Sequence, residues 1–326
     1  MRTRSARGAG GRAARRRRGA TGVLLAAAAL LLAACSSGGQ EAQAPAADGA
    51  DGATRAVATA FGEVQVPAAP QRVVALGEPA LDTALAVGVT PVGVTASRGG
   101  TAPPAYLGAQ VASLPIVGTV TEPNVEEVLA AQPDLILGTT STTQEQYDAL
   151  SKIAPTVAPA AAEMGRWQEP LKVYARALGK ADELGTQLAD LEQRAAALQQ
   201  QGTFAVLRWM PAGAVVMNAG LMPGSLLSAT GAAPVQPATA LGKAPHSDPL
   251  SLENLTQVDA DRIFVASLNA EGRTALEAAR QQPAFTRLKA ARSGAVNSVD
   301  GAVWSSSSGP IAARLVVEDI EEAVRG

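Results

Sequence analysis

The side chains most suited to chemistry in this chain of 326 residues are arginines that stand next to tryptophans. Arg208 and Trp209 are adjacent near the end of a predicted strand, and Arg166 and Trp167 are adjacent ahead of a helical segment. Trp304, the third tryptophan, follows another predicted strand. A guanidinium beside an indole offers positive charge and a planar apolar surface, which suits an anionic or oxygen-rich chelate with apolar arms. These residues predict a ligand-binding cleft, with core packing as the alternative for each tryptophan and solvated surface as the alternative for Arg166.

Three further residues are candidates for this cleft because of their place along the chain. Parallel α/β sheets bind ligands outside the carboxyl ends of their strands. Glu78 follows a predicted strand at 73–76, and Arg98 and Tyr106 belong to a long loop rich in Gly and Pro. An acid at position 78 conflicts with a strongly anionic chelate unless Arg98 or Arg208 compensates its charge. Plain solvated surface is the alternative for Arg98.

Several classes of function are disfavoured by what the sequence lacks. One cysteine, Cys35, excludes an internal disulfide, and one histidine, His246, excludes a His-rich metal site. No Gly-x-Ser-x-Gly elbow, phosphate loop or HExxH motif is present, which argues against a lipoprotein enzyme. No direct metal ligand, catalytic residue or cofactor is therefore predicted.

The amino-terminal segment predicts export. Residues 2–18 contain eight arginines and no acid, residues 23–34 are an unbroken apolar run, and Cys35 follows. A membrane span needs about 20 apolar residues, so residues 1–34 are predicted to be a signal peptide. Leu32-Ala33-Ala34-Cys35 resembles the bacterial lipobox, which implies cleavage before Cys35 and attachment of lipid to its thiol. The choice between general and twin-arginine export stays open.

The mature chain is acidic and has the pattern of an α/β protein. Without the arginines of the leader it carries 19 basic against 29 acidic residues, which disfavours nucleic acid as a partner. Residues 35–56 are predicted to be a flexible tether, and beyond them β-branched runs alternate with helical patterns, which indicates parallel sheets. Strands are expected at 73–76, 91–95, 116–117, 134–137, 155–157, 204–210, 214–218, 262–266 and 295–299, and helices at 80–87, 124–131, 144–152, 225–230, 252–258, 274–281 and 310–324.

A helical stretch without strand signals separates two groups of strands. Apolar residues from Leu184 to Leu198 recur at helical spacing, after a break at Gly179. A helix over 180–201 is roughly 30 Å long and can cross between two lobes, although a surface helix of one lobe is the alternative. The expected domains are an amino-terminal lobe at 57–179, an interlobe helix at 180–201 and a carboxy-terminal lobe at 202–326.

Two segments repeat with a constant offset of 127 residues. Asn124-Val-Glu-Glu-Val and Pro133-Asp-Leu-Ile match Ser251-Leu-Glu-Asn-Leu and Ala260-Asp-Arg-Ile. The apolar matches follow from packing of a helix against a strand. The matched glutamates, Glu126 and Glu253, do not, and a charge favoured by the helix dipole is the simple account of each.

These segments together resemble the class III substrate-binding lipoproteins of ATP-driven importers for ferric siderophores and cobalamin. The resemblance covers nearly all of residues 70–326 and rests on Arg72-Val-Val-Ala-Leu, Pro91-Val-Gly-Val, the repeat and the mid-chain helix, in that order. It implies an α/β fold of two Rossmann-like lobes with parallel sheets, joined by a single long rigid helix, with the ligand in a cleft between the lobes. It also implies that Glu126 and Glu253 pair with arginines of an ABC permease dimer without touching the cargo.

The resemblance also indicates a cargo and a location. Relatives with an arginine before Met-Pro-Ala/Gly-Gly, here Arg208 before Met210-Pro-Ala-Gly, look like siderophore binders. A hydroxamate or mixed-type ferric siderophore is favoured because the cleft lacks the several basic residues typical of catecholate binders. Cobalamin or haem on the same scaffold is the alternative, although His246 and Tyr106 are poor candidates for a haem ligand. The protein is expected to be a monomer, lipid-anchored to the outer face of the cytoplasmic membrane.

Overall fold

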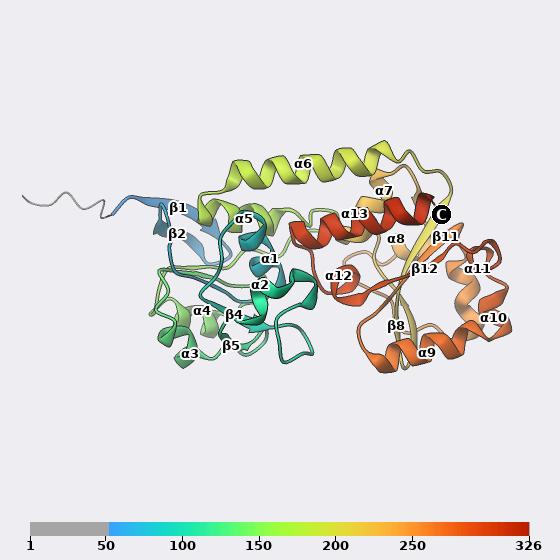
Figure 1. Cartoon of the computed structure of the whole chain (residues 1–326), viewed down its shortest axis with the longest axis horizontal. Helices are drawn as coiled ribbons and strands as arrows, with labels where there is room; N and C mark the ends of the chain where they lie inside the picture. Colours follow the sequence, from blue (N-terminus) through green and yellow to red (C-terminus); the bar gives the residue numbers. More distant parts are fainter. Residues whose placement is uncertain (1–51, 326) are drawn as a thin grey trace, which may run out of the picture. The chain divides into compact units, whose positions relative to one another are not determined.

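Residues 52–325 are described by a computed structural model (Figure 1). The expected signal peptide at 1–34, the lipidation site Cys35 and most of the expected tether lie outside these residues. In the part that is described, none of the helices has both the length and the apolar character needed to cross a membrane.

Short, almost fully apolar strands form the first sheet, as is typical of parallel strands covered on both faces. The strands are β3 (Val73–Ala75), β4 (Gly93–Ala96), β5 (Ile116–Thr119), β6 (Leu135–Leu137) and β7 (Thr156–Val157), with helices α1 (Glu78–Ala86), η1 (Ala105–Leu107), α2 (Ala109–Ala112), α3 (Val125–Ala130), α4 (Gln144–Leu150) and α5 (Glu169–Leu178). Their order is β5-β4-β3-β6-β7, and all are parallel. Alternate residues of β3 enter different cores: Val73 packs with α1 and α5, and Val74 packs with α3 and α4.

The second sheet also has five strands, of which four are parallel and one is antiparallel. Its elements are β8 (Thr203–Met210), β9 (Gly213–Val216), α7 (Met222–Ala229), β10 (Ala233–Pro234), α8 (Gln236–Thr239), η2 (Leu252–Val258), β11 (Arg262–Ser267), α9 (Ala270–Arg280), α10 (Pro283–Thr286), α11 (Lys289–Ser293), β12 (Val296–Asp300), α12 (Gly301–Ser305) and α13 (Pro310–Arg325). Strands β10-β8-β11-β12 are parallel, and β9 pairs with β8 in the antiparallel direction. The predicted α/β fold with parallel sheets is confirmed.

The segment 252–258, expected as an α-helix, is instead the 3₁₀-helix η2. Its apolar residues Leu252, Leu255 and Val258 are three residues apart, which matches the 3.0-residue turn of a 3₁₀-helix. Leu255 and Val258 are buried, whereas Leu252 is exposed. The spacing of the apolar residues therefore explains the difference.

The described chain has two halves, one built on the first sheet and one on the second. Helix α6 (Ala181–Ala197) runs beside both of them (Figure 1). Leu184 and Leu188 pack in the core cluster of the first sheet, and Leu191 and Ala195 pack in a cluster of the second. Gly179, with a left-handed φ of 72°, ends α5 and lets the chain turn into α6. The same helix thus contributes to both cores.

Helix α13 also packs against both halves of the described chain. It packs against α1 of the first half and against α6 and α7. Ile311 contacts the core cluster of the first sheet, and Ala312 and Val316 belong to a cluster of the second. The amphipathic carboxy-terminal helix therefore contributes to both cores, and the expectation of a single rigid connecting helix stays a prediction.

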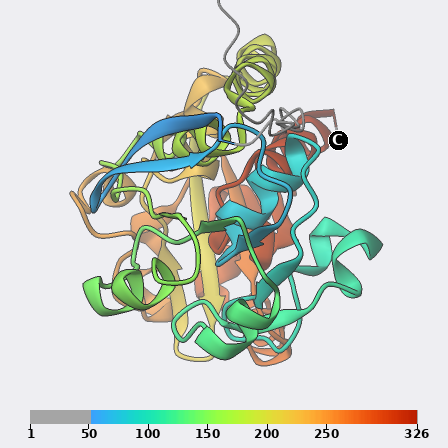
Figure 2. The same cartoon turned by 90° about the vertical axis from the view of Figure 1, so that its left-hand side faces the viewer.

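An antiparallel hairpin precedes the first sheet and was not expected. It consists of β1 (Thr54–Thr59) and β2 (Gly62–Pro67), and it packs against α5 (Figure 2). Val57 and Val66 are buried in the first core, and the Arg55 guanidinium donates to the carbonyl oxygens of Arg176 and Ala68. Residues 54–56, assigned to the tether, therefore belong to the fold, because β1 carries a buried valine into the core.

The 127-residue repeat corresponds to equivalent structures in the two halves. In the first, the carboxylate of Asp134 accepts the backbone N–H of Arg72 just before β3, at 2.9 Å. In the second, Asp261 accepts the backbone N–H of Thr203 at the start of β8, at 2.7 Å. Lys289 and Thr203 hold the pKa of Asp261 well below its usual range by bonding to its charged form. Each repeated aspartate therefore ties its strand to the central strand of its sheet.

Candidate functional site

The loops that follow two neighbouring strands of the first sheet open into a pocket. The chain leaves β3 toward β4 on one side and β6 toward β7 on the other, so β3 and β6 border the point where the strand order reverses. Open parallel sheets place ligands at such a switch point, outside the carboxyl ends of the strands. Glu78 follows β3 and residues 139–141 follow β6, and all of them line the pocket.

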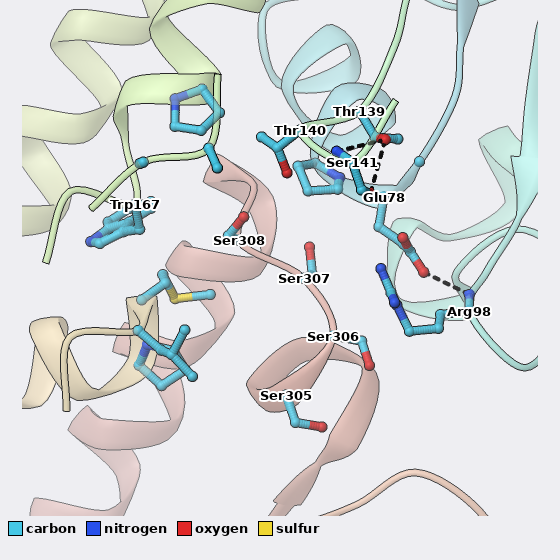
Figure 3. A pocket seen from close by; sticks show the side chains of 18 of the residues that line it. Glu78, Arg98, Thr139, Thr140, Ser141, Trp167, Ser305, Ser306, Ser307 and Ser308 are labelled. Atoms are coloured by element: carbon cyan, nitrogen blue, oxygen red, sulfur yellow. Dashed lines mark hydrogen bonds between the residues drawn. The ribbon is translucent and has the colours of Figure 1, made fainter. Parts of the chain in front are cut away.

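The pocket encloses about 340 Å³ and takes its walls from both halves of the described chain (Figure 3). This volume lies in the range of roughly 300–1,000 Å³ found for small-molecule sites. The first half contributes residues 77–79, 98, 120, 139–141, 161–164, 167, 170 and 174, and the second half contributes residues 217, 220–223 and 304–308. A ligand in this pocket would therefore contact residues associated with both sheets.

Glu78 and Arg98 form the charged side of the pocket. Glu78 is almost fully buried at the start of α1, and its Oε1 accepts the backbone N–H of Arg98 at 2.7 Å (Figure 3). This bond holds the loop that carries the exposed Arg98 side chain at the pocket. Glu78 is thus engaged with its own loop, and the positive charge that was expected to compensate it lies in the same pocket wall.

Two short runs of hydroxyl side chains form the other polar walls. Thr139, Thr140 and Ser141 connect β6 to α4, and the segment 305–308 contributes four serines, from the last residue of α12 into the loop before α13 (Figure 3). The Thr139 hydroxyl accepts the backbone N–H of Ser141 at 3.2 Å, which shapes that loop. Hydroxyl groups can donate and accept, so these two walls suit a ligand with many oxygen atoms.

Two of the three tryptophans line the pocket. Trp167 is half-buried, so part of its ring is exposed to the pocket. Trp304 is only 1% exposed, so it belongs to the buried part of the pocket wall. Trp304 stacks on Phe264 with ring centroids 4.7 Å apart, and its indole N–H donates to Asp319 Oδ2 at 2.6 Å. Burial raises the pKa of Asp319, and the Trp304 hydrogen bond opposes that rise. Trp304 is therefore held rigidly, and Trp167 is the aromatic surface available to a ligand.

Trp209, expected in the cleft, is not among the residues that line this pocket. It is 3% exposed in a core cluster on the other face of β8, where its ring meets Phe285 edge-on at 5.9 Å. Neighbouring residues of a strand point to opposite faces of the sheet. Arg208 and Trp209 consequently cannot both face the same cleft, and core packing is the role of this tryptophan.

Arg208 is not among the residues that line the pocket, but it shares the electrostatic environment of Arg98. Its guanidinium is partly buried, and its Nε has no hydrogen-bond partner within residues 52–325. Burial lowers the pKa of Arg208, and the charge of Arg98 lowers it further. In this part of the chain neither arginine takes part in an ion pair. Arg98 thus lies in the pocket wall with the carboxylates of Glu78 and Glu163, and Arg208 lies close enough for its pKa to respond to the charge of Arg98.

The other expected ligand contacts are placed differently. Arg166 is exposed and does not line the pocket, in agreement with its surface alternative. Tyr106 also does not line it, because its hydroxyl lies behind Ser307, to which it is hydrogen-bonded at 2.7 Å. Tyr106 therefore supports the pocket wall rather than forming it.

The repeated glutamates lie outside the pocket and are exposed. Glu126 is in the first turn of α3, where the Asn124 side chain accepts its backbone N–H at 3.0 Å, and Glu253 is in the first turn of η2. His246 is half-buried in a loop, and its Nδ1 lies 2.8 Å from the carbonyl oxygen of Ser247. Within residues 52–325, His, Cys, Asp and Glu side chains do not gather in groups of three or more that could hold a metal ion.

The hydroxyl runs at 139–141 and 305–308 were not predicted from the sequence. Both follow a predicted strand, at 134–137 and 295–299, so the rule that pointed to Trp304 applied equally to them. Serines and threonines are common in loops, which is why their composition gave no separate signal.

The chain belongs to the periplasmic binding protein family, whose model matches residues 73–302. It is similar to a probable siderophore-binding lipoprotein of Bacillus subtilis, YfiY, with 32% identity over 82% of this chain and 87% of that protein. It is also similar to the achromobactin-binding periplasmic protein of Dickeya dadantii, with 30% identity over 77% of this chain and 85% of that protein.

A solved structure shares the fold. The crystal structure of Staphylococcus aureus SirA complexed with staphyloferrin B superposes with a TM-score of 0.74, covering 83% of this chain and 99% of that chain. The two sequences are 24% identical, so this match concerns the fold alone. The resemblance inferred from the strand and helix motifs is thereby confirmed at the level of the family.

Proposed function

We propose that this protein is the solute-binding component of an ABC importer and that it captures a ferric siderophore in the pocket between its two sheets. The observation that carries this proposal is the composition of that pocket. Arg98, Trp167 and two runs of hydroxyl groups converge at a strand-order switch point, where family members with this fold would hold a ligand.

The pocket matches the chemistry of a ferric chelate. A siderophore surrounds iron with anionic or carbonyl oxygens and exposes planar or apolar arms. Hydroxyl groups at 139–141 and 305–308 can donate to those oxygens, Arg98 and Arg208 supply positive charge, and Trp167 supplies a flat apolar surface. The protein needs no metal ligand of its own in this scheme, because the chelate brings its iron fully coordinated.

The relatives support a siderophore over cobalamin. The two similar proteins described above are named for a siderophore or for achromobactin. Cobalamin and haem therefore serve as competing ligands in the test rather than as a second proposal.

The protein acts outside the cytoplasm, as the periplasmic and lipoprotein names of its relatives support. We propose that the mature chain begins at Cys35 and is held by lipid on that thiol. A diacylated or triacylated cysteine gives stable anchoring, which a single acyl chain does not. The acidic residues of the folded part would then face a permease in the same membrane.

The permease contact is proposed for Glu126 and Glu253. They occupy matching positions in the repeat, one in each half, and both are exposed. Two carboxylates, one on each half, can pair with two basic side chains of a permease dimer. Both pairs form together only when the two halves hold the carboxylates at the matching distance. Neither lies among the residues of the pocket, so docking and cargo binding use separate surfaces.

The test is a titration of tryptophan fluorescence in the mature chain, residues 35–326. The ligands are a ferric trihydroxamate, a ferric catecholate, ferric citrate, cobalamin and haem, with uncomplexed iron as a control. Saturable quenching by one ferric chelate at low ligand concentration, with a dissociation constant at least tenfold below that of cobalamin, supports the proposal. If only cobalamin saturates the quenching, the proposed cargo changes from a siderophore to cobalamin. If no ligand gives saturable quenching, the proposal that this pocket is the ligand-binding site is contradicted.

A further inference from the structure

A buried carboxylate of the first half caps the last helix of the second half. Asp82, in α1, is fully buried. Its Oδ1 accepts the backbone N–H of Ile311 at 2.7 Å, and its Oδ2 accepts that of Ala312 at 3.0 Å. Both donors are free amino-terminal N–H groups of α13, which also carry the positive end of the helix dipole. The contact joins residues more than 200 positions apart across the seam between the halves.

A chain of hydroxyl groups leads from this carboxylate to the pocket. The Tyr106 hydroxyl donates to Asp82 Oδ2 at 2.9 Å and lies 2.7 Å from Ser307 Oγ. Ser307 lines the pocket (Figure 3), and its Oγ also accepts the backbone N–H of Gly309 at 3.4 Å. A Cβ at Gly309 would overlap the Asp82 carboxyl group, so the approach of Asp82 requires a glycine there. Asp82, Tyr106 and Ser307 form what we term the seam relay.

The surroundings of the seam relay allow Asp82 to take up a proton near neutral pH. Burial raises the pKa of Asp82 to about 6, against the hydrogen bonds from Ile311, Ala312 and Tyr106 and the charge of Arg314 on α13. Burial and the charges of Asp82 and Glu78 raise the pKa of Tyr106 well above its usual value, so it remains a neutral phenol.

Helix α5 also packs against α1, but it does not join this network. Its buried Tyr174 donates its hydroxyl to the carbonyl oxygen of Gly138 at 2.8 Å. Burial raises the pKa of Tyr174, so it too remains neutral. Tyr174 therefore offers a comparison: a buried tyrosine that borders the same pocket without contact to Asp82.

The two protonation states of Asp82 give opposite donor and acceptor directions to the hydrogen bonds among Asp82, Tyr106 and Ser307. When Asp82 is ionised, Tyr106 donates to it and Ser307 donates to Tyr106, so the Ser307 oxygen can only accept from a ligand. When Asp82 takes a proton from hydronium onto Oδ2, one O–H bond of hydronium breaks and a water molecule is released. Asp82 then donates to the Tyr106 oxygen, Tyr106 donates to Ser307, and the Ser307 hydrogen is free to point into the pocket. Only the new O–H bond of Asp82 forms; the other two hydrogens rotate about existing C–O bonds.

We propose that Asp82 is a positioning residue for the cargo, which through Tyr106 sets whether the Ser307 hydroxyl accepts from or donates to a ligand in the pocket. This inference rests on the proposed function for the identity of the ligand, but not for the relay itself. An oxygen-rich anionic chelate gains a hydrogen bond from Ser307 only when Asp82 is protonated. Its affinity should therefore rise, by about tenfold, as the pH falls from 7.5 to 5.

The first test needs no cargo. Backbone amide spectra of the mature chain are recorded from pH 7.5 to 4.5, and the signals of Ile311, Ala312 and Gly309 are followed. All three should shift with one midpoint near pH 6, because the first two bond to Asp82 and the third bonds to Ser307. In Tyr106→Phe, which keeps the cap on α13, Ile311 and Ala312 should still shift, while the response of Gly309 should shrink to the part that its direct proximity to Asp82 causes. An unchanged Gly309 response in that variant, or no midpoint near 6 for Ile311 and Ala312, would overturn the relay.

The second test measures the effect on cargo. Dissociation constants for ferric citrate, prepared with excess citrate, are compared between the wild type and Tyr106→Phe at each pH. Protonation of the ligand affects both proteins equally, so the ratio of their dissociation constants isolates the relay. The ratio should change about tenfold between pH 7.5 and 5, and Tyr174→Phe should give the same shape of pH profile as the wild type. A constant ratio would overturn the inference, whereas failure of any chelate to bind would overturn the proposed function and leave the spectral test to decide on the relay.

Discussion

Burial of Asp82 predicts an unusual dependence of stability on pH. Burial raises the pKa of this carboxyl group from 3.8 to about 6 in the folded protein. The folded state therefore binds the proton more tightly than the unfolded state, and protonation favours folding. The shift of about two pKa units, at about 1.4 kcal/mol each, corresponds to about 3 kcal/mol. This stabilisation is fully present below pH 3.8 and is lost as the pH rises through about 6.

The assay is urea unfolding of the wild type and of Asp82→Asn at steps from pH 7.5 to 3.5. The other carboxylates titrate in both proteins, so the difference between their free energies of unfolding isolates Asp82. That difference should move in favour of the wild type by about 3 kcal/mol as the pH falls. Asp261→Asn serves as a control of opposite sign, because Lys289 and Thr203 lower the pKa of Asp261 and its contribution is lost on acidification. A difference for Asp82→Asn that stays constant over this range would show that the pKa of Asp82 is not raised in the folded protein.

Three further predictions concern binding, uptake and packing. Arg208→Ala should weaken binding of the ferric chelate by roughly tenfold, measured by fluorescence titration, because a partly buried positive charge without a partner is removed. Glu126→Ala combined with Glu253→Ala should leave that affinity unchanged and reduce uptake of the radiolabelled iron chelate by cells. Gly309→Ala should lower the free energy of unfolding, measured in urea, by about 1–3 kcal/mol, because the new Cβ would overlap Asp82. Gly185 lies on an exposed turn of α6 with open space around it, so Gly185→Ala should raise the free energy of unfolding by up to about 1 kcal/mol.

Matched variants decide each of these outcomes. Arg292→Ala removes an exposed arginine, and equal loss of affinity in this variant would contradict a specific role for Arg208. Glu127→Ala combined with Glu271→Ala removes two other exposed glutamates, and intact uptake in the Glu126 and Glu253 double variant would remove the docking assignment. A neutral Gly309→Ala would show that the seam tolerates a displaced Asp82.

The alternation of strands and helices could be predicted because each buried strand is a nearly continuous apolar run. Parallel strands such as β3 and β6 are covered on both faces, so they differ plainly from the polar loops around them. The hairpin β1–β2 was missed because only one face of each strand is buried. Its two buried residues, Val57 and Val66, stand among small and polar residues that have the composition of a tether.

The site was predicted in part, because the position of a residue after a strand is visible in a sequence but the direction of its side chain is not. Glu78, Arg98, Trp167 and Trp304 line the pocket, as the rule of carboxyl strand ends indicated. The same rule selected Trp209, which the alternation along β8 turns into the core.

Asp82 could not be found in the sequence, because nothing there shows which distant segment meets a given helix. It stands in a predicted helix, and its partners Ile311 and Ala312 belong to the last helix of the chain. Only the packing of α1 against α13 brings the carboxylate to the two N–H groups.

The central claim is that a ferric siderophore binds in the pocket between the two sheets. Crystals of the mature chain with the chelate selected by titration, measured at the iron absorption edge, locate the metal directly. We expect one strong anomalous peak inside the pocket, with Trp167 and Ser307 on its walls and no protein atom bound to the iron. A peak outside this pocket, or iron coordinated by side chains of the protein, would contradict it.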